Sequence, residues 1–318
     1  MPRQAAKSHV YKELTLQQLR SFCETARLGS LAAAAKEMGL THPTVREQVL
    51  ALQRDFGVKL IEPHRRGCRL TAEGQLLAEI ATPIITATNG LKERFDLAHT
   101  NAEIRLTVAG PPRVIQEDLP DAILALLKTA PQLRVAFLEL HDDLVIEAVE
   151  SGAADLGLTS ESVPDRPPPG LTIEPAYELE TLLITPKGHP LASRRKVRPA
   201  DLRHYPLISS RHSLSDQPAL AANLDRNRVF DGPPPRVEPF LASTVRTYIK
   251  LNLGIALIYG LLPRKRSPHF HERSMSEYFG RGLVRFVLRR GTPHEAWARM
   301  LMTLIRKCNE LPSTKDSN

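Results

Sequence analysis

Hydrophobic and polar positions repeat with a helical period from residue 14 to residue 57 and predict three short helices. Glycines separate these helices, because Gly29 ends the first and Gly39 ends the second. Ser30 and Thr41 directly precede the second and third helices and can cap them. The apolar positions fall on inward faces, at Leu16, Leu19, Phe22, Cys23, Ala26, Ala34, Ala35, Met38, Leu40, Val45, Val49 and Leu52.

A basic hairpin and a long amphipathic helix are predicted next. The stretch 59–71, KLIEPHRRGCRLT, has two short apolar segments around a basic turn. From residue 71 to about residue 99 the apolar positions again follow a helical period, at Leu76, Leu77, Ile80, Ile84 and Leu91. Pro83 is expected to interrupt or kink this helix. Because it lies between a small unit and a large one, the helix is expected to link them and to form a dimer contact.

After residue 102 short apolar strands alternate with amphipathic helices. The predicted strands are IRLTVAG, LRVAFLEL, ADLGLTS, TLLITP, YPLISS, IALIYG and LVRFVLRRG. The predicted helices are LPDAILALLKTAP, DDLVIEAVESG, VRTYIKLNLG and residues 295–309. This alternation predicts an α/β unit with a parallel sheet. The tail 312–318 is expected to be disordered.

Composition narrows the class of protein further. A chain of 318 residues is expected to form two or three compact units. The formal charge of +8 suits an acidic partner such as nucleic acid. Its three cysteines lie far apart, so neither a disulfide framework nor a zinc motif is expected. No signal peptide and no apolar run of membrane-spanning length is present, so we expect a cytoplasmic protein without a membrane partner.

Residues 31–53 have the pattern of a helix–turn–helix, with a short first helix, a glycine turn and a second helix. The second helix is expected to present His42, Thr44, Arg46, Glu47 and Gln48 outwards. Arginine can read guanine, glutamine can read adenine, and glutamate can accept from cytosine. The hairpin turn would then act as a wing over phosphates, using His64, Arg65, Arg66 and Arg69.

A plainer interpretation is that the third helix simply exposes a charged first turn to water. For any single helix that is the commoner case. The combination of Gly39, the inward apolar spacing and the basic hairpin favours DNA binding instead.

At this point the sequence resembles the LysR-type transcriptional regulators, from about residue 14 to residue 309. The resemblance lies in LQQLRSFCETARLGSLAAAAKEM, THPTVREQVLALQRDFGVKLIE, RLTAEG, SGAADLGL and TPKGHPLA, in that order. It implies a mainly α winged helix–turn–helix at 11–71 and a linker and dimerisation helix at 72–101. It further implies an α/β effector domain with two lobes, like a periplasmic binding protein. Lobe I would span 102–184 and 264–310, with lobe II at 185–263 between them and a disordered tail at 311–318.

The resemblance also implies partners and site residues. Partners would be promoter or operator double-stranded DNA, further copies of the chain in dimers or tetramers, RNA polymerase, and a small-molecule effector. The implied DNA-binding set is Ser30, Thr41, His42, Pro43, Thr44, Arg46, Glu47, Gln48, His64, Arg65, Arg66 and Arg69.

Two positions depart from the family pattern. The family's recognition helix commonly reads Ser-Gln-Pro-x-Leu-Ser-Arg-Gln-Ile, where this chain has residues 41–49, THPTVREQV. The acidic Glu47 replaces a base-reading arginine, and Arg46 sits one residue earlier, about 100° round the helix. Pro63 replaces a frequent wing arginine, whose phosphate contact Arg65 and Arg66 would take over. An altered operator preference is therefore expected.

By the same resemblance the effector would lie between the lobes, where backbone amides and small hydroxyls best suit an anion. The expected lining is Gly110, Pro111, Ser160, Ser209, Ser210, Ser243 and Thr244. The segment STVRTYIKLNLGIALI is similar to the branch of cysteine-biosynthesis regulators. Serines and threonines at these places are equally ordinary caps, and Gly-Pro-Pro at 110–112 removes amide donors. A degenerate effector domain without a ligand therefore stays open.

The alternative from another class of protein is an enzyme or a small-molecule-binding α/β protein. Its DNA-binding module would then not recognise a base sequence. No nucleotide-binding, nucleophile-elbow or cofactor motif supports it, so no cofactor and no catalytic residue is expected. The segment PHFHE at 268–272 is only a weak hint of a metal, and no metal site is expected.

Overall fold

The computed structural model describes residues 14–65, 67–92, 95, 104–160, 164, 167–209, 218–239, 242–262 and 267–309. The chain divides into two compact units. The first contains residues 1–94 together with two short later segments, 168–170 and 290–293. The second contains residues 95–167, 171–289 and 294–318.

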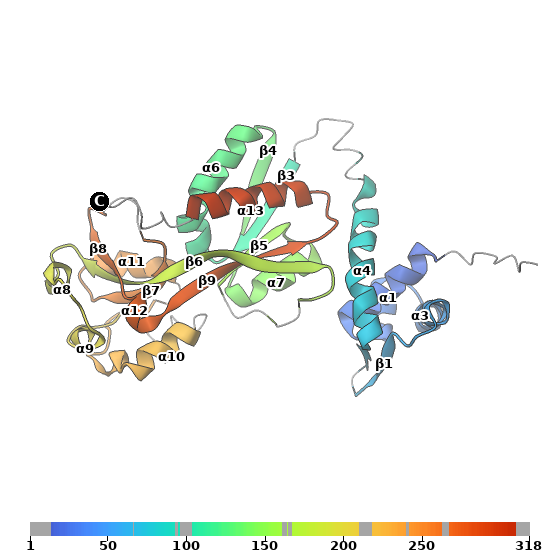
Figure 1. Ribbon diagram of the computed structural model, residues 1–318, viewed down its shortest axis with the longest axis horizontal. Coiled ribbons are helices and arrows are strands. Elements are labelled where there is room, and N and C mark those ends of the chain that lie inside the picture. Colours follow the sequence, from blue (N-terminus) through green and yellow to red (C-terminus); the bar gives the residue numbers. More distant parts are fainter. Residues whose placement is uncertain are drawn as a thin grey trace, which may run out of the picture. The chain divides into compact units, whose positions relative to one another are not determined.

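The first unit begins with the three predicted helices, α1 (Leu16–Leu28), α2 (Leu31–Glu37) and α3 (His42–Phe56) (Figure 1). The side chains of Ser30 and Thr41 cap α2 and α3 by accepting from backbone amides in the first turn, as predicted. Phe22, Val49 and Leu52 are buried in one apolar cluster. Burying each such side chain contributes about 1.5–3 kcal/mol, which holds α3 against α1.

The hairpin consists of β1 (Ile61–His64) and β2 (Gly67–Leu70), which pair in antiparallel fashion. Helix α4 (Ala72–Asn89) follows directly and packs on α1. It passes so close to the hairpin that a Cβ atom on Gly74 would lie 1.9 Å from the Leu60 carbonyl oxygen. Only glycine therefore fits there without moving the backbone.

Helix α4 has two apolar faces. Leu77, Ala78, Ala81 and Ile85 are buried, whereas Leu76, Ile80 and Ile84 are exposed by 59%, 56% and 47%. The helix continues through Pro83 without interruption and ends at Gly90. The predicted extension to residue 99 falls mostly on residues outside the described part of the chain.

The second unit is built on one sheet of seven strands. Its order is β4-β3-β5-β9-β6-β7, and β8 also pairs with β6. The strands are β3 (Ile104–Gly110), β4 (Leu133–Glu139), β5 (Leu156–Thr159), β6 (Leu171–Pro186), β7 (Ala256–Gly260), β8 (Phe270–Ser274) and β9 (Arg281–Arg289). The long strand β6 pairs first with β9 and then with β7 and β8, so it runs through both lobes.

Helices cover both faces of this sheet (Figure 1). In lobe I, α6 (Pro120–Thr129) and α13 (Glu295–Asn309) share one core with β3, and α7 (Asp142–Ser151) packs on the other face. In lobe II, α11 (Ala242–Lys250) packs on β6 and β7. The remaining short elements are η1 (Val114–Asp118), α8 (Pro190–Ser193), α9 (Pro199–Leu202), α10 (Pro218–Arg226), η2 (Val229–Asp231) and α12 (Ser276–Phe279).

The prediction of a parallel sheet is only partly correct. Strand β3 pairs in parallel with β4 and β5, but β5–β9 and all pairs of β6 are antiparallel. The reason is that β9 returns from lobe II without a crossover helix and enters between β5 and β6. Strand β6 begins ten residues before the predicted TLLITP, because polar residues along its first half hid the strand pattern.

The predicted strand YPLISS is wrong among its described residues, which form only an isolated bridge between Leu207 and Ile255. Pro206 lacks the N–H that a central strand needs, although its carbonyl accepts from Ile255. Strand β8 was missed, since PHFHE lacks an alternating apolar pattern.

A charged network is buried in lobe I. The Arg113 guanidinium donates to Asp118 at 3.0 Å, and the Tyr177 hydroxyl donates to the same carboxylate at 2.6 Å. Burial opposes the charge on Arg113, but the neighbouring Asp118 more than offsets it and the pKa of Arg113 is raised. A buried pair of this kind becomes costly when one partner is removed.

Replacing Asp118 with alanine is therefore expected to lower the free energy of unfolding by about 3–5 kcal/mol, because Arg113 would remain buried and charged. Urea titration of the full-length chain, followed by the fluorescence of its single tryptophan, Trp297, reports on this unit. The control is Glu178→Ala, which breaks an exposed pair with Arg281 and should cost less than about 1 kcal/mol. Equal midpoints for both variants would contradict this account.

Candidate nucleic-acid interface and effector cleft

Helix α3 has a buried side and an outward side. Val45, Val49 and Leu52 are buried, at 0%, 1% and 0% exposure. Since each residue turns a helix by about 100°, the side opposite these three carries Pro43, Glu47, Leu50 and Arg54, with Arg46 beside them. These five residues, called here the outward face, are all exposed.

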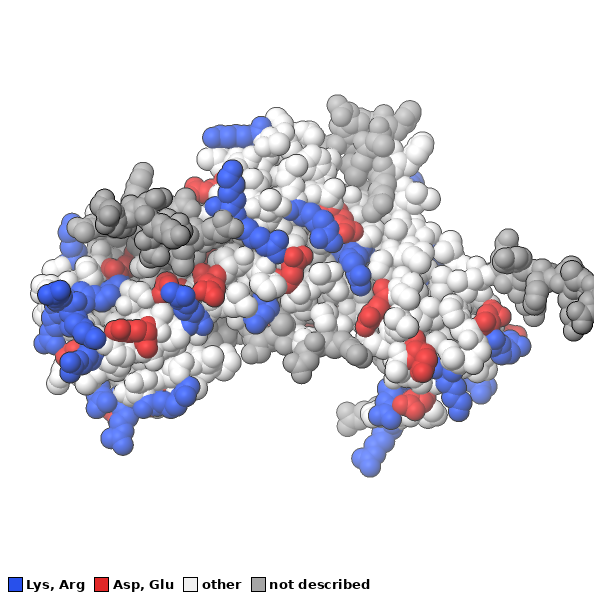
Figure 2. Space-filling model, in the orientation of Figure 1, with Lys and Arg blue, Asp and Glu red and all other residues white. Residues whose placement is uncertain are grey.

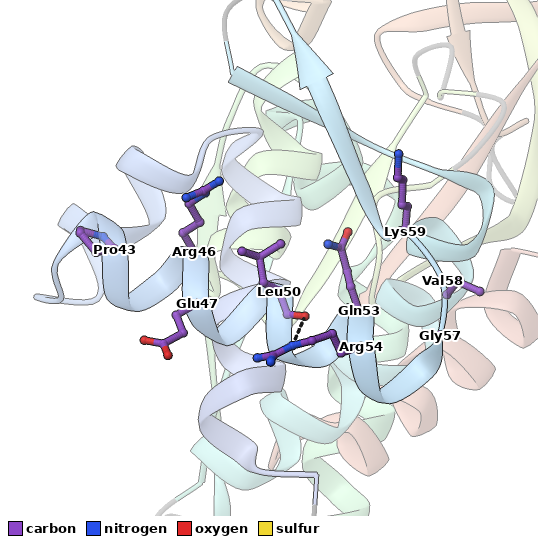
Figure 3. A pocket seen from close by; sticks show the side chains of 9 residues that line it. All are labelled: Pro43, Arg46, Glu47, Leu50, Gln53, Arg54, Gly57, Val58 and Lys59. Atoms are coloured by element: carbon purple, nitrogen blue, oxygen red, sulfur yellow. Dashed lines mark hydrogen bonds between the residues drawn. The ribbon is translucent and has the colours of Figure 1, made fainter.

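A groove of about 630 Å³ follows the outward face (Figure 3). It is lined by Pro43, Arg46, Glu47, Leu50, Gln53, Arg54, Gly57, Val58 and Lys59. Three of these side chains are cationic and one is anionic, so the groove is basic overall. The sequence pattern identified only the first three of these residues as site residues.

Gln53 ties the end of α3 to the hairpin. Its side-chain oxygen accepts from the backbone amides of Leu60 at 2.8 Å and Ile61 at 3.3 Å. Without this acceptor both amides would need another partner. The direction of the hairpin is therefore coupled to the outward face of α3.

Gln48 does not belong to the outward face, which corrects the prediction made from sequence. Its side-chain oxygen accepts a hydrogen bond from the Ser21 hydroxyl of α1, and the residue is half-buried. The physical reason is its position directly before Val49, at the edge of the buried stripe.

The other predicted residues of the helix–turn–helix lie at helix starts. Ser30 and Thr41 act as caps, and the Thr41 and Thr44 hydroxyls lie 2.7 Å apart. His42 is exposed at the first position of α3. Thr41, His42 and Thr44 lie at the N-terminal end of α3, which is the end that enters the major groove in helix–turn–helix proteins.

The hairpin presents charged side chains at its turn. His64 and Arg65 are exposed, whereas Arg66 lies outside the described residues. Arg69 donates to Glu62 at 2.7 Å across the two strands. Both partners are exposed, by 66% and 42%, so this pair is weak and leaves Arg69 able to exchange its partner.

Charge alone does not mark this surface. Figure 2 shows acidic and basic side chains interspersed over the face of the molecule that it draws. The candidate interface is defined by the outward face of α3 and the hairpin turn.

In the second unit, two expected effector residues come together at one sheet edge. Strands β3 and β5 are parallel neighbours, so Gly110 at the end of β3 and Ser160 directly after β5 lie at the same edge of the sheet. Pro111 is buried and its carbonyl accepts from Ile115. The Ser160 hydroxyl and amide both donate to Asp142, at 2.8 Å each. The polar groups at this edge are thus already paired.

One expected residue of lobe II, Ser209, is not available to a ligand. Ser209 is fully buried, and its hydroxyl accepts from the Leu257 amide at 3.0 Å. Thr244 is exposed on α11. Ser210 and the side chain of Ser243 lie outside the described residues.

Arg246 of α11 connects the two lobes and was not found from sequence. Its guanidinium donates to Glu117 of η1 at 3.0 and 3.3 Å and also donates to Glu272 of β8. It lies 5.9 Å from the centre of the Phe270 ring. Burial opposes its charge, but the two carboxylates more than offset this and the pKa of Arg246 is raised. Arg246 and Glu117 are 129 residues apart in the chain, so no local sequence pattern could predict that they pair.

Metal binding, membrane spanning and redox sensing by Cys23 find little support in the described part of the chain. No group of three His, Cys, Asp or Glu residues there could hold a metal ion, including the PHFHE segment of β8. No helix of the described residues is long and apolar enough to span a membrane. Cys23 is buried, which raises the pKa of its thiol to about 11 and makes it a poor redox sensor.

These features define a class of protein, a winged helix–turn–helix domain with a two-lobed α/β domain. Residues 16–75 match the bacterial regulatory helix-turn-helix proteins of the lysR family, and residues 99–308 match the LysR substrate binding domain. The chain belongs to the LysR family, whose members are transcriptional regulators.

Two regulators illustrate the relationship. CysB of Burkholderia cenocepacia is 25% identical over 299 residues, covering 92% of this chain and 93% of that protein. CbbR of Xanthobacter flavus is 30% identical over 252 residues, covering 77% and 72%.

Solved structures agree on the fold. CbnR, a LysR family transcriptional regulator, gives a TM-score of 0.52 at 21% identity, with 94% of this chain and 100% of that chain covered. Full-length OxyR from Pseudomonas aeruginosa gives 0.56 at 18% identity, with 97% and 100% covered. The predicted fold class and family are therefore confirmed.

Replacing Gln53 with leucine, which has a similar size and no acceptor, is expected to loosen the hairpin. Amide hydrogen exchange of Leu60 and Ile61 should accelerate roughly fivefold, because a hydrogen bond contributes about 1 kcal/mol. The Gln53→Glu variant keeps the acceptor and serves as the control. Unchanged exchange in the leucine variant would show that Gln53 does not hold the hairpin.

Proposed function

We propose that this protein binds operator DNA with the outward face of α3 in the major groove and the hairpin turn over the phosphates. The observation that carries this proposal is the outward face of α3, which is exposed, carries Arg46, Glu47 and Arg54, and is fixed in rotation by the buried stripe behind it. His42, Thr44, Arg46 and Glu47 would face bases, while Arg65 and Arg69 would contact phosphates. Arg66 belongs to the same proposal by its place in the turn.

The predicted domain boundaries and self-association belong to this proposal as well. The exposed apolar stripe of α4, formed by Leu76, Ile80 and Ile84, recurs every fourth residue as a helix–helix contact requires. Pairing of α4 with a second copy would cover this stripe and place two copies of α3 on one operator. By its family, we propose dimers that assemble into tetramers, contact with RNA polymerase, and a cytoplasmic location without enzymatic activity.

The two-lobed domain is proposed to receive a small-molecule effector. The edge formed by Gly110, Pro111 and Ser160 and the nearby α11 would be the site. Arg246 is the cation at this place, and it already has Glu117 and Glu272 as partners. An anionic effector would therefore have to displace a carboxylate from Arg246.

A second candidate is a regulator whose effector domain binds no ligand. The engaged hydroxyls of Ser160 and Ser209 and the two prolines after Gly110 favour it. In that case the Arg246–Glu117 pair would only hold the lobes together.

The proposal is tested by selecting genomic DNA fragments with the full-length protein at near-physiological salt, where non-specific phosphate binding is weak. Enrichment of a few near-palindromic intergenic sites supports a sequence-specific regulator and identifies the operator. Recovery without any sequence preference would contradict base reading by α3.

Within such an operator, replacing Glu47 with alanine is expected to relax the preference at one base pair per half-site. A good base contact contributes about 1–3 kcal/mol of discrimination, so the preference should fall roughly fivefold or more. Competition binding with single-base variants of the operator measures it. Glu73→Ala, a carboxylate in the first turn of α4, is the matched control and should leave the base preference unchanged.

For the effector, replacing Glu117 with glutamine is expected to strengthen anion binding, because it removes the competing charge from Arg246. A melting-shift screen of the full-length chain with sulfate and small carboxylates should raise Tm by about 3 °C at roughly ten times Kd. The Arg246→Ala variant should lose the shift, whereas Lys128→Ala on α6 should keep it. If no compound raises the Tm of either the natural chain or the Glu117→Gln variant, the result would favour an effector domain that binds no ligand.

A further inference from the structure

Leu50 lies at the centre of the outward face, although it cannot form a hydrogen bond with its side chain. It is 42% exposed. Its neighbours three and four residues away on the helix are Arg46, Glu47, Gln53 and Arg54, all polar. Figure 3 shows the Leu50 side chain between Arg46 and Gln53. A single exposed leucine is ordinary on a protein surface, but this one occupies the surface that DNA would cover.

The arginines beside Leu50 suit an acidic partner. Arg54 donates from Nε to the Leu50 carbonyl oxygen at 3.4 Å, which keeps its side chain along the helix. Lys59 lines the same groove at the base of the hairpin. An apolar protein partner would have to desolvate these cations, whereas DNA neutralises them with phosphates.

The floor of the major groove offers one apolar group, the C5-methyl of thymine. Leu50 lies on the outward face of α3, which would face the floor of the groove. It is three residues after Glu47, a rise of about 4.5 Å, close to the 3.4 Å step between base pairs. Leu50 and Glu47 would therefore face neighbouring base pairs.

We propose that Leu50 is a specificity-determining residue that contacts the methyl group of a thymine, one base-pair step from the position that Glu47 reads. This inference rests on the proposed operator binding by α3. Leu50 would select thymine by an apolar contact, in addition to the base that Glu47 selects by a polar contact. Burying the methyl group favours thymine over every other base at that position.

The test replaces each thymine of the selected operator with uracil, one position at a time. Uracil keeps every hydrogen-bonding group of thymine and lacks only the methyl group. Full-length protein should bind about threefold to fivefold more weakly at one such position in each half-site. The Leu50→Ala variant should bind the parent operator more weakly by a similar factor and be indifferent to uracil at that position. The Leu124→Ala variant alters an exposed leucine of α6, outside the candidate interface, and should keep the discrimination.

The outcomes separate the two proposals. If no sequence is enriched, operator reading by α3 fails and the methyl contact fails with it. If an operator is enriched but natural chain and Leu50→Ala respond alike to every uracil, only the methyl contact is overturned. If Leu50→Ala binds all duplexes as tightly as the natural chain, Leu50 contributes nothing to DNA binding, which also overturns the methyl contact.

Discussion

Burial of Val45, Val49 and Leu52 sets the rotation of α3, and everything on its outward side depends on that rotation. A helix turned by one residue would swing each side chain by about 100°, replacing Glu47 with Gln48 at the centre of the interface. The bond from Ser21 to Gln48 holds the opposite edge of the helix. Gln53 of α3 accepts hydrogen bonds from the backbone amides of Leu60 and Ile61, so the hairpin is oriented together with α3. The orientation of α3 and that of the hairpin are thus both fixed by one patch of core packing.

The effector domain uses its arginines in two different ways. Arg113 is committed to the core of lobe I, where Asp118 and Tyr177 leave it no freedom to meet a ligand. Arg246 retains 23% exposure of its side chain and pairs with one carboxylate from η1 and one from β8. Exchanging one carboxylate partner for another would cost little additional desolvation, which makes Arg246 the better place for a signal to act.

Local sequence signals predicted the first unit well, because caps, glycines and helical periodicity are properties of neighbouring residues. The caps at Ser30 and Thr41 and the bounds of α13 were predicted correctly for this reason. The position of Gln48, the partners of Gln53 and the Arg246–Glu117 pair depend on contacts between distant segments, which periodicity does not record. The sheet shows the same division: the parallel strands β3, β4 and β5 followed from alternation, whereas the antiparallel entry of β9 did not.

The place of β9 in the sheet also governs the order in which the chain can be completed during synthesis. Strand β9 lies between β5 and β6, yet it is the last strand to leave the ribosome. Until residue 289 has been made, β5 and β6 have no common neighbour and the two halves of the sheet stay separate. The segment 290–293, which belongs to the first unit, is made later still. A nascent chain can therefore form its helix–turn–helix while the edges of β5 and β6 are still unpaired. Unpaired strand edges can pair with other chains, so this stage of synthesis favours aggregation.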